Sequence, residues 1–115
     1  MNFEKNADVP AERNLPFGLE TSCADNAFSV SVRGRLDTIT APQLLFCYQN
    51  AAEKINSIHV DGSNMTYITS AGMRALLMMY KSLDNKDNFH LINLSPDVVE
   101  MLELAGFAQF LHPRG

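Results

Sequence analysis

Hydrophobic and polar residues alternate between positions 28 and 33, which is the period of a β-strand with one buried face. Residues 17–22 can form a preceding strand, and Ala24, Asp25 and Asn26, between the two segments, are residues typical of turns. The pattern therefore predicts a β-hairpin. The apolar side of its second strand consists of Phe28, Val30 and Val32, and the polar side of Ser29, Ser31 and Arg33.

A helix is predicted after the loop at residues 34–40. Thr40 is placed as its N-cap, Pro42 in its first turn, and Gln43 at the position that completes a capping box. Apolar residues then recur at helical spacing and predict the buried side of this helix. They are Leu44, Tyr48, Ala51 or Ala52, and Ile55.

The central part of the chain predicts a short buried strand at residues 57–60, a polar loop, and a helix that begins at the turn of residues 69–72. Apolar residues outside the main buried stripes are either peripheral core or a flexible surface for a protein partner. In this group are Met78, Met79, Met101 and Leu104. The buried side of the central helix is expected to contain Met73, Leu76, Leu77, Tyr80 and Leu83.

Residues 85–88 form a predicted turn and residues 89–92 a short strand. Ser95 and Pro96 begin a third helix, which Gly106 ends, and residues 107–111 are expected to be a last edge strand. Alternating strands and helices imply parallel strands joined by right-handed crossovers. The predicted fold class is therefore α/β: one small domain with a mixed, mostly parallel sheet of about five strands and about three helices.

This topology also predicts where a site lies. In a parallel sheet, the loops that leave the carboxyl ends of the strands meet at one edge. The loop that contains Asp37 and the turn at Thr69 and Ser70 should therefore be neighbours, although more than thirty positions separate them in the sequence. Asp61, at the end of the predicted central strand, is expected to cap the loop that follows it.

The composition of the chain limits the number of domains and the kinds of partner that can be expected. The chain has 115 residues, of which 46% are hydrophobic, so one domain is expected at residues 16–115 after a loose, charged arm at residues 1–15. A net charge of −4 argues against nucleic acid as a partner, because phosphate backbones require a basic face. No apolar stretch approaches the ~20 residues of a membrane helix, and no signal peptide is visible. A soluble, cytoplasmic protein without a membrane partner is therefore expected.

Neither the cysteines nor the histidines have the spacing of a metal site. Cys23 and Cys47 are expected to be small buried hydrophobic residues, as lone thiols usually are, which fits a reducing cytoplasm. His59, His90 and His112 are expected to be structural or exposed. The sequence predicts no metal and no cofactor.

The start of the central helix is the main candidate for chemistry. A helix N-terminus favours negative charge, because its first N–H groups have no partner within the helix. A hydroxyl of Thr69 or Ser70 at this place either caps the helix or accepts a phosphate. An enzyme is not predicted, because Ile68 stands where the G-x-S-x-G nucleophile motif requires glycine and no motif places a histidine beside Ser70.

Three stretches of the chain resemble one known family, in the family's order and at its spacing. The stretch YITSAGMRALL, residues 67–77, resembles the conserved segment of STAS domains, the family of bacterial anti-sigma factor antagonists. VRGRLDTITAPQL, residues 32–44, is similar to the first conserved loop and helix start of that family. LSPDVVEMLELAG, residues 94–106, is similar to its third helix. The resemblance extends from about residue 16 to the end of the chain.

The resemblance implies a phosphorylation site and a binding surface. Ser70 occupies the position of the serine that a partner kinase phosphorylates, with Thr69 as the alternative acceptor. Asp37 matches the acidic residue of the first loop, which the resemblance places in the kinase-recognition surface; a turn-stabilising role remains open. The implied partner-binding residues are Asp37, Thr38, Thr69, Ser70, Gly72, Met73 and Arg74.

The resemblance also implies the partners, namely an anti-sigma factor with serine kinase activity and a serine phosphatase. The chain itself is expected to be a monomer or a weak dimer. The alternative is a STAS-type binding scaffold or transport-accessory module without a phosphorylation cycle.

The sequence departs from the family pattern at three places. Thr69 replaces the aspartate that usually precedes the acceptor, and Arg74 stands where a small residue is common. The chain also ends at Gly115, before the final helix that many members have. The sequence therefore leaves open how the last strand is covered.

Overall fold

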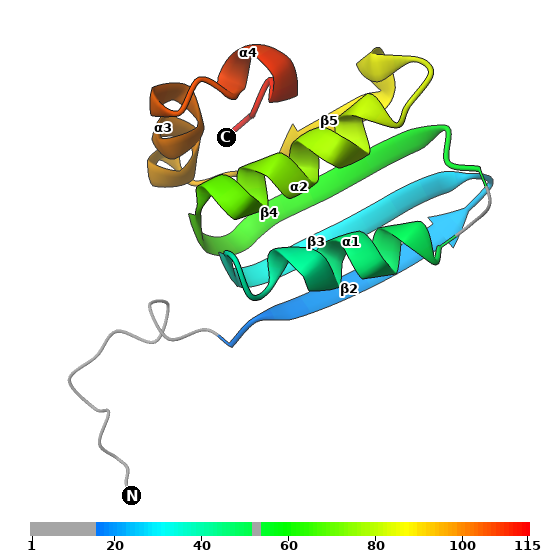
Figure 1. Cartoon of the computed structure of the whole chain (residues 1–115), viewed down its shortest axis with the longest axis horizontal. Coiled ribbons are helices and arrows are strands. Elements are labelled where there is room, and N and C mark those ends of the chain that lie inside the picture. Colours follow the sequence, from blue (N-terminus) through cyan, green and yellow to red (C-terminus); the bar gives the residue numbers. More distant parts are fainter. Residues whose placement is uncertain (1–15, 52–53) are drawn as a thin grey trace, which may run out of the picture.

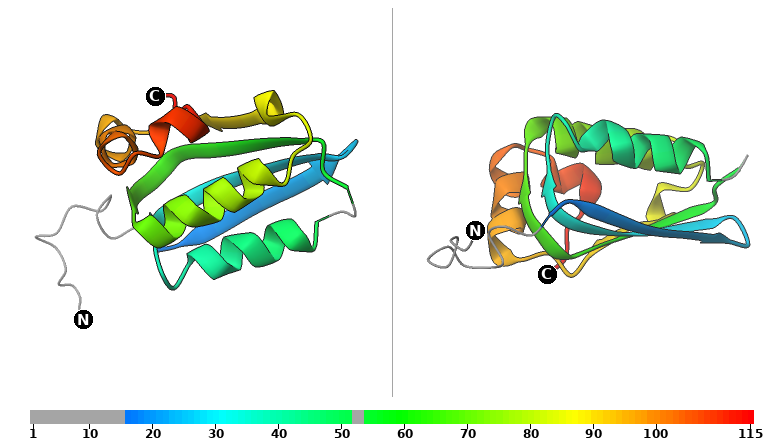
Figure 2. Two further views of the ribbon diagram at one scale, coloured as in Figure 1. Left: turned by 45° about the horizontal axis from the view of Figure 1, so that its top comes forward. Right: turned by 90° about the horizontal axis from the view of Figure 1, so that it is seen from below.

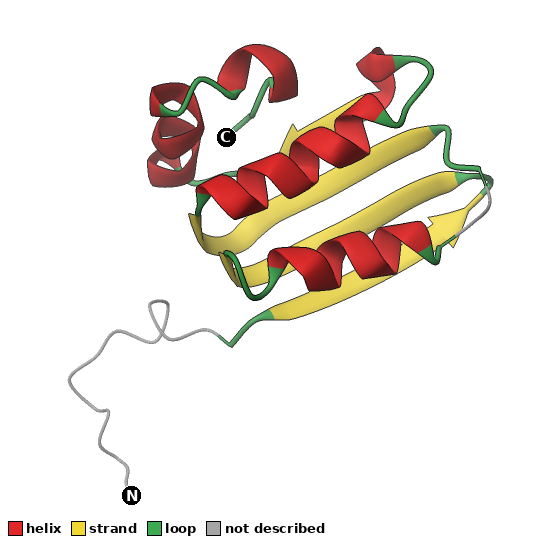
Figure 3. Ribbon diagram, in the orientation of Figure 1, coloured by secondary structure: helices red, strands yellow, loops and turns green. Residues whose placement is uncertain are grey.

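A mixed β-sheet forms the centre of the computed structural model, which describes residues 16–51 and 54–115 (Figures 1 and 3). Its described strands lie side by side in chain order: β2 (Gly18–Ala24), β3 (Ala27–Leu36), β4 (Ser57–Ile68) and β5 (Phe89–Ile92). The helices are α1 (Ala41–Gln49), α2 (Ser70–Lys81), α3 (Pro96–Leu104) and the short α4 (Ala108–Leu111), with a 3-10 turn at Lys86–Asn88. The predicted α/β class is confirmed, whereas the arm at residues 1–15 lies outside the described residues.

The predicted hairpin is confirmed. β2 and β3 pair antiparallel without a register shift, with Thr21 opposite Val30 and Ala24 opposite Ala27. The connecting residues Asp25 and Asn26 have φ angles of 53° and 65°. Two consecutive left-handed residues make the tight turn whose twist matches that of the flanking strands, and Asp and Asn adopt this conformation at low cost.

β4 corrects the prediction of a short strand, because it continues through the segment predicted to be a polar loop and ends only at Ile68. It pairs in parallel with β3 as far as Leu36 opposite Ile68, and in parallel with β5. Two register shifts interrupt the β3–β4 ladder. Such irregularities break the alternation of apolar and polar residues, which is why the second half of the strand was not predicted.

Helices α1 and α2 cover the same face of the sheet (Figure 2). α2 packs between α1 on one side and α4 on the other. Its buried arc is therefore wider than one stripe, and Met79, predicted to lie off the main buried stripe, is 0% exposed. Leu77 and Tyr80, predicted inside it, are only half-buried. The largest fully buried side chains of the core are Phe28, Val32, Leu36, Leu44, Ile58, Val60, Leu76, Met79, Leu83, Leu91, Leu102 and Leu111.

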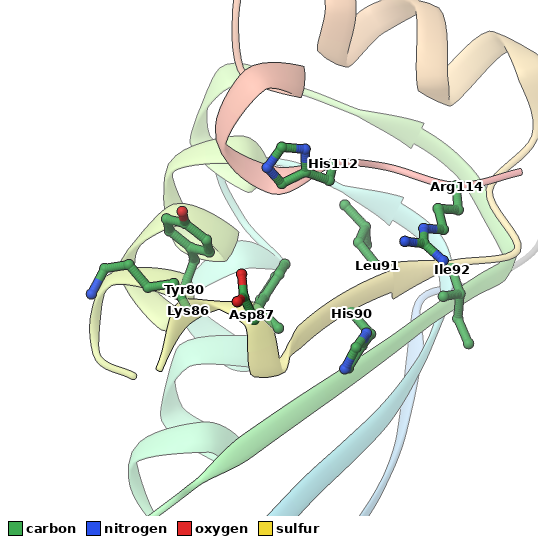
Figure 4. A pocket seen from close by; sticks show the side chains of 9 residues that line it. Tyr80, Lys86, Asp87, His90, Leu91, Ile92, His112 and Arg114 are labelled. Carbon is green, nitrogen blue, oxygen red and sulfur yellow. The ribbon is translucent and has the colours of Figure 1, made fainter. Parts of the chain in front are cut away.

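The carboxyl-terminal segment corrects another prediction. The apolar run at residues 107–111 forms α4 rather than an edge strand, with Leu111 N–H donating to the carbonyl of Phe107 (3.0 Å). Periodicity cannot distinguish a strand from a helix in so short an apolar run. The edge of β5 is covered instead by the end of the chain, where Arg114 N–H donates to the carbonyl of Leu91 (3.0 Å) and Leu94 N–H to that of Arg114 (2.9 Å) (Figure 4).

The end of β3 and the start of α2 form a close junction. The N–H of Thr69 donates to the carbonyl of Leu36 (3.0 Å). Gly72, in the first turn of α2, packs so tightly on the same residue that a Cβ atom at position 72 would lie 2.4 Å from the Leu36 carbonyl oxygen. Because that oxygen belongs to the backbone, it cannot move aside without shifting the strand.

The junction predicts the effect of Gly72→Ala. Alanine is the better helix former by about 1 kcal/mol, so an unobstructed site would be stabilised. We expect the opposite, a loss of about 1–3 kcal/mol in the free energy of unfolding, because the added methyl group overpacks the junction. Urea denaturation measures this loss, with Arg74→Ala as the control on an exposed position of the same helix, expected within about 0.5 kcal/mol of wild type. A Gly72→Ala protein as stable as wild type would contradict the close approach.

Candidate functional site

The carboxyl ends of β3 and β4 bring two turns together. Leu36 pairs with Ile68, so the loop after β3 and the turn before α2 leave the sheet at the same edge. The Thr69–Leu36 hydrogen bond joins the two directly. The expectation that the Asp37 loop and the Thr69–Ser70 turn are neighbours is therefore confirmed.

The Asp37 loop is held by its own polar groups. Asp37 Oδ1 accepts hydrogen bonds from the N–H groups of Ile39 (3.0 Å) and Thr40 (3.1 Å). The Thr40 hydroxyl accepts from Asp37 N–H (2.8 Å) and lies 2.7 Å from the carbonyl of Arg35, to which it donates. Thr40 stands at the N-cap position of α1 but makes no side-chain cap, so the predicted capping box with Gln43 is wrong. Its hydroxyl is used to close the loop instead.

These contacts stabilise the charged form of the Asp37 carboxyl group. The N–H of Thr40 is the largest cause that lowers the pKa of Asp37 below its usual value. The N–H of Ile39, the Thr40 hydroxyl and the Arg35 guanidinium lower this pKa further, and partial desolvation opposes them. The turn-stabilising role of Asp37 is thus visible in the structure, and the residue carries a full negative charge at neutral pH.

The two hydroxyls at the start of α2 have different surroundings. Thr69 is the N-cap, but its side chain caps no N–H group, and its Oγ1 atom is buried without a hydrogen-bond partner among the described residues. Ser70 is the first residue of the helix and is exposed. Ser70 therefore lies at the surface, whereas the hydroxyl of Thr69 does not.

The other residues expected at the binding surface divide into two groups. Thr38 and Arg74 are exposed, as Ser70 is, and Asp37 is half-buried. Gly72 and Met73 are buried. These two residues support the surface from beneath and do not present side chains to a partner.

Sequence reasoning missed three residues beside this surface. The Arg35 guanidinium lies 4.4 Å from the ring centroid of Tyr67, and its Nε lies 3.7 Å from Asp37 Oδ2. Ile39, at the tip of the Asp37 loop, is 76% exposed. Two features of the sequence could have indicated them: Ile39 is apolar within a polar loop, and Arg35 stands two positions before Asp37. Exposed apolar and aromatic side chains beside charged ones are typical of protein-binding surfaces.

The remaining candidates lie away from this edge. Asp61 lies within β4 rather than at its end; it accepts from the N–H of Ser63 (2.9 Å), as a capping residue would. His59 and His90 stack across β4 and β5, with ring centroids 4.7 Å apart. Within residues 16–51 and 54–115, no three His, Cys, Asp or Glu side chains are grouped as metal ligands. None of the described helices is long and apolar enough to cross a membrane.

The structure defines a class of small α/β domains in which a mixed sheet presents two turns at one edge. Residues 19–113 match the family model described as "Mlab, STAS domain". The chain therefore belongs to the STAS domain family.

Several proteins similar to this chain are named anti-sigma factor antagonists. An anti-sigma-B factor antagonist of Staphylococcus epidermidis is 26% identical over 100 residues, which cover 85% of this chain and 93% of the relative. An anti-sigma factor antagonist from Mycobacterium paratuberculosis has a similar structure, with a TM-score of 0.71, 23% identity, and coverage of 86% of this chain and 85% of that one. The unphosphorylated form of the anti-sigma factor antagonist SpoIIAA also has a similar structure. Its TM-score is 0.63, with 19% identity and coverage of 83% of this chain and 84% of that one. SpoIIAA of Bacillus has also been solved in the phosphorylated form, with a TM-score of 0.57, 18% identity, and coverage of 83% and 87%.

The lowered pKa of Asp37 predicts a pH-dependent contribution to stability. A carboxyl group whose pKa is lower in the folded protein stabilises it above the unfolded pKa of about 3.9, and this stabilisation is lost as the pH falls through the folded pKa. Asp37→Asn should therefore lower the melting temperature at pH 7, and the difference from wild type should close below about pH 4. The control is Asp84→Asn, because the side chain of Asp84 is 93% exposed. A constant difference at all pH values would show that the charge of Asp37 does not stabilise the loop.

Proposed function

We propose that this chain is an anti-sigma factor antagonist that binds an anti-sigma factor with serine kinase activity, and that phosphorylation of Ser70 ends this binding. The observation that carries the proposal is the exposure of Ser70 at the first turn of α2, beside the Asp37 loop. The anti-sigma factor antagonists among its relatives support the general role.

The surroundings favour Ser70 over Thr69 as the acceptor. A kinase must reach the hydroxyl oxygen in line with the phosphate of ATP. Ser70 is exposed, whereas the Oγ1 atom of Thr69 is buried. The N-terminus of α2 also favours the phosphate once it is attached, through the helix dipole and through N–H groups that no side chain caps.

Charge supplies the switch in this proposal. A phosphate adds close to two negative charges at pH 7. It would stand next to the ionised Asp37 in a chain whose net charge is already −4. Repulsion and the cost of desolvating these charges would then disfavour rebinding of the kinase partner. A serine phosphatase would restore the binding form.

The surface offers the partner both charge and apolar area. Arg74 is exposed one turn after Ser70 in α2, and Thr38 is exposed in the neighbouring Asp37 loop. Ile39 in the same loop adds a large exposed apolar side chain. Apolar side chains at the centre of an interface with charges at its rim are the usual arrangement of specific protein complexes. We therefore assign Ile39 to the same binding surface as Asp37, Ser70 and Arg74.

The second candidate is a STAS-type scaffold or transport-accessory module without a phosphorylation cycle. It is favoured by Thr69, which stands where the family usually has aspartate. The presence of genes for a serine kinase and a phosphatase beside this one would distinguish the two functions in favour of the switch.

Phosphate mapping tests the acceptor. Incubation with the cognate kinase and ATP, followed by mass spectrometry, should place one phosphate on Ser70. Ser70→Ala should remain unmodified, whereas Thr69→Val should be modified as wild type is, because the Oγ1 it removes is buried. Ser70→Asp should weaken binding of the kinase, in part only, because a carboxylate carries one charge and fewer acceptors than a phosphate. Phosphate on Thr69, or none with an active kinase, would refute the assignment.

Arg74→Ala tests the binding surface. A guanidinium on the exposed side of α2 can form a forked pair with a partner carboxylate. We expect calorimetric titration to show an affinity for the kinase partner at least about tenfold lower, or about 1.4 kcal/mol, with an unchanged melting curve. Lys81→Ala is the control, because this exposed cation lies at the opposite end of the same helix. Equal affinities of the two variants would leave Arg74 as a solvated surface charge.

A further inference from the structure

The two edges of the sheet differ in how they are covered. The outer edge of β5 is hydrogen-bonded to the carboxyl-terminal segment at Leu91, and Leu94, shortly after the strand, bonds to the same segment. The outer edge of β2 has no such cover from residues 16–51 or 54–115, and residues 20–24 of this strand are exposed. An uncovered edge presents backbone N–H and C=O groups that can pair with another strand.

β2 also lacks the features that usually prevent such pairing. Edge strands of monomeric proteins are protected by lysine, proline, a bulge or short length. β2 has seven residues, GLETSCA, with neither lysine nor proline and with Glu20 as its one charge. Its register with β3 is regular from Gly18 to Ala24, so no bulge turns the edge away.

The hairpin determines which groups point outward. In a two-residue hairpin, the residues that flank the turn exchange both hydrogen bonds, and every second pair along the ladder repeats this. Ala24 and Ala27 flank the turn here, so Ser22 and Glu20 also bond to β3. The N–H and C=O groups of Leu19, Thr21 and Cys23 therefore point away from β3, toward the open edge.

An apolar groove runs beside the same strand on the helix side. Its volume is about 510 Å³, and its lining includes Phe17 and Leu19 together with Phe46 and Cys47 of α1. Phe46 is 67% exposed, although it is a large apolar residue. A strand added at the edge of β2 would cover part of this apolar surface.

We propose that the occupant of this edge is β2 of a second copy of the chain, paired antiparallel about a two-fold axis at Thr21. This inference goes beyond the function proposed above and is independent of it. With the axis at Thr21, all seven residues pair, Thr21 with itself and Leu19 with Cys23, so every outward-pointing residue meets an outward-pointing residue. Glu20 then lies opposite Ser22 of the second copy. A shift that set Glu20 opposite itself would place two like charges together.

The register of this pairing can be tested with a lysine at each of two neighbouring positions, because it predicts opposite effects of the two lysines on dimer affinity. Thr21→Lys places two lysines opposite each other, whereas Ser22→Lys places each lysine opposite Glu20 of the second copy. Sedimentation velocity of the full chain, from about 5 to about 500 µM, should show a weak dimer. Thr21→Lys should weaken this dimer by about threefold to tenfold, and Ser22→Lys should strengthen it by a similar factor.

A second measurement tests the register directly. Paired residues whose strands exchange hydrogen bonds lie about 5.5 Å apart between Cα atoms, which is within the range of a disulfide. In a chain with Cys23→Ser and Cys47→Ser, Thr21→Cys should therefore cross-link two copies under mild oxidation. Ser22→Cys should not, because its counterpart is offset by two residues and lies about 8 Å away.

Several outcomes would overturn the proposal. They are a monomer throughout the concentration range, a dimer in which both lysine variants shift affinity in the same direction, or cross-linking through Ser22→Cys alone. Deletion of residues 2–13 distinguishes pairing with a second copy from pairing with the chain's own N-terminal arm. If the full chain is a monomer and the shortened chain dimerises through Thr21, the occupant of the edge is the chain's own N-terminal arm.

Discussion

The hydrogen bond from Thr69 N–H to the carbonyl of Leu36, with Gly72 packed on the same carbonyl, is the contact on which the candidate site depends. It joins the last residue of β3 to the first turn of α2 and so fixes two loops that are distant in sequence. Only a residue without a side chain lets the helix approach the strand this closely. A glycine expected at the binding surface thus acts from beneath it, by setting the position of Ser70 relative to Asp37.

Asp37 combines a structural and an electrostatic role because its two carboxylate oxygens have different neighbours. Oδ1 is held by the N–H groups of Ile39 and Thr40, whereas Oδ2 faces the exposed Arg35 guanidinium at 3.7 Å. The first oxygen fixes the loop, and the second leaves a negative charge near the surface. Ion pairs as exposed as this one are weak, so Arg35 can exchange Asp37 for another anion at little cost. A partner that binds here meets a carboxylate whose position does not depend on the ion pair.

Much of the fold could be predicted from the sequence, because the hairpin and the main helices have regular spacing of apolar residues. The neighbouring positions of Asp37 and Ser70 also followed from the topology of parallel strands. The second half of β4 could not be predicted, since register shifts interrupt its pattern. Neither could α4, since a five-residue segment with four apolar residues fits a strand or a helix. The full burial of Met79 was not predicted either, in a helix that packs against both α1 and α4. The different exposure of Thr69 and Ser70 could not be predicted either, because the sequence shows two adjacent hydroxyl groups and not their orientation.

The two proposed surfaces are both bordered by α1. Its first residue, Ala41, donates its N–H to the carbonyl of Asp37 (2.8 Å), while Phe46, further along the same helix, borders the groove beside β2. Their positions in the sheet are nevertheless distinct, since Thr21 pairs near the middle of β3 and Asp37 follows its end. A second copy at the β2 edge would therefore leave Ser70 accessible to a kinase. Coupling between the two surfaces would require a shift of α1 or of β3, and the hydrogen bond from Ala41 to Asp37 would pass a shift of α1 on to the loop at the candidate site.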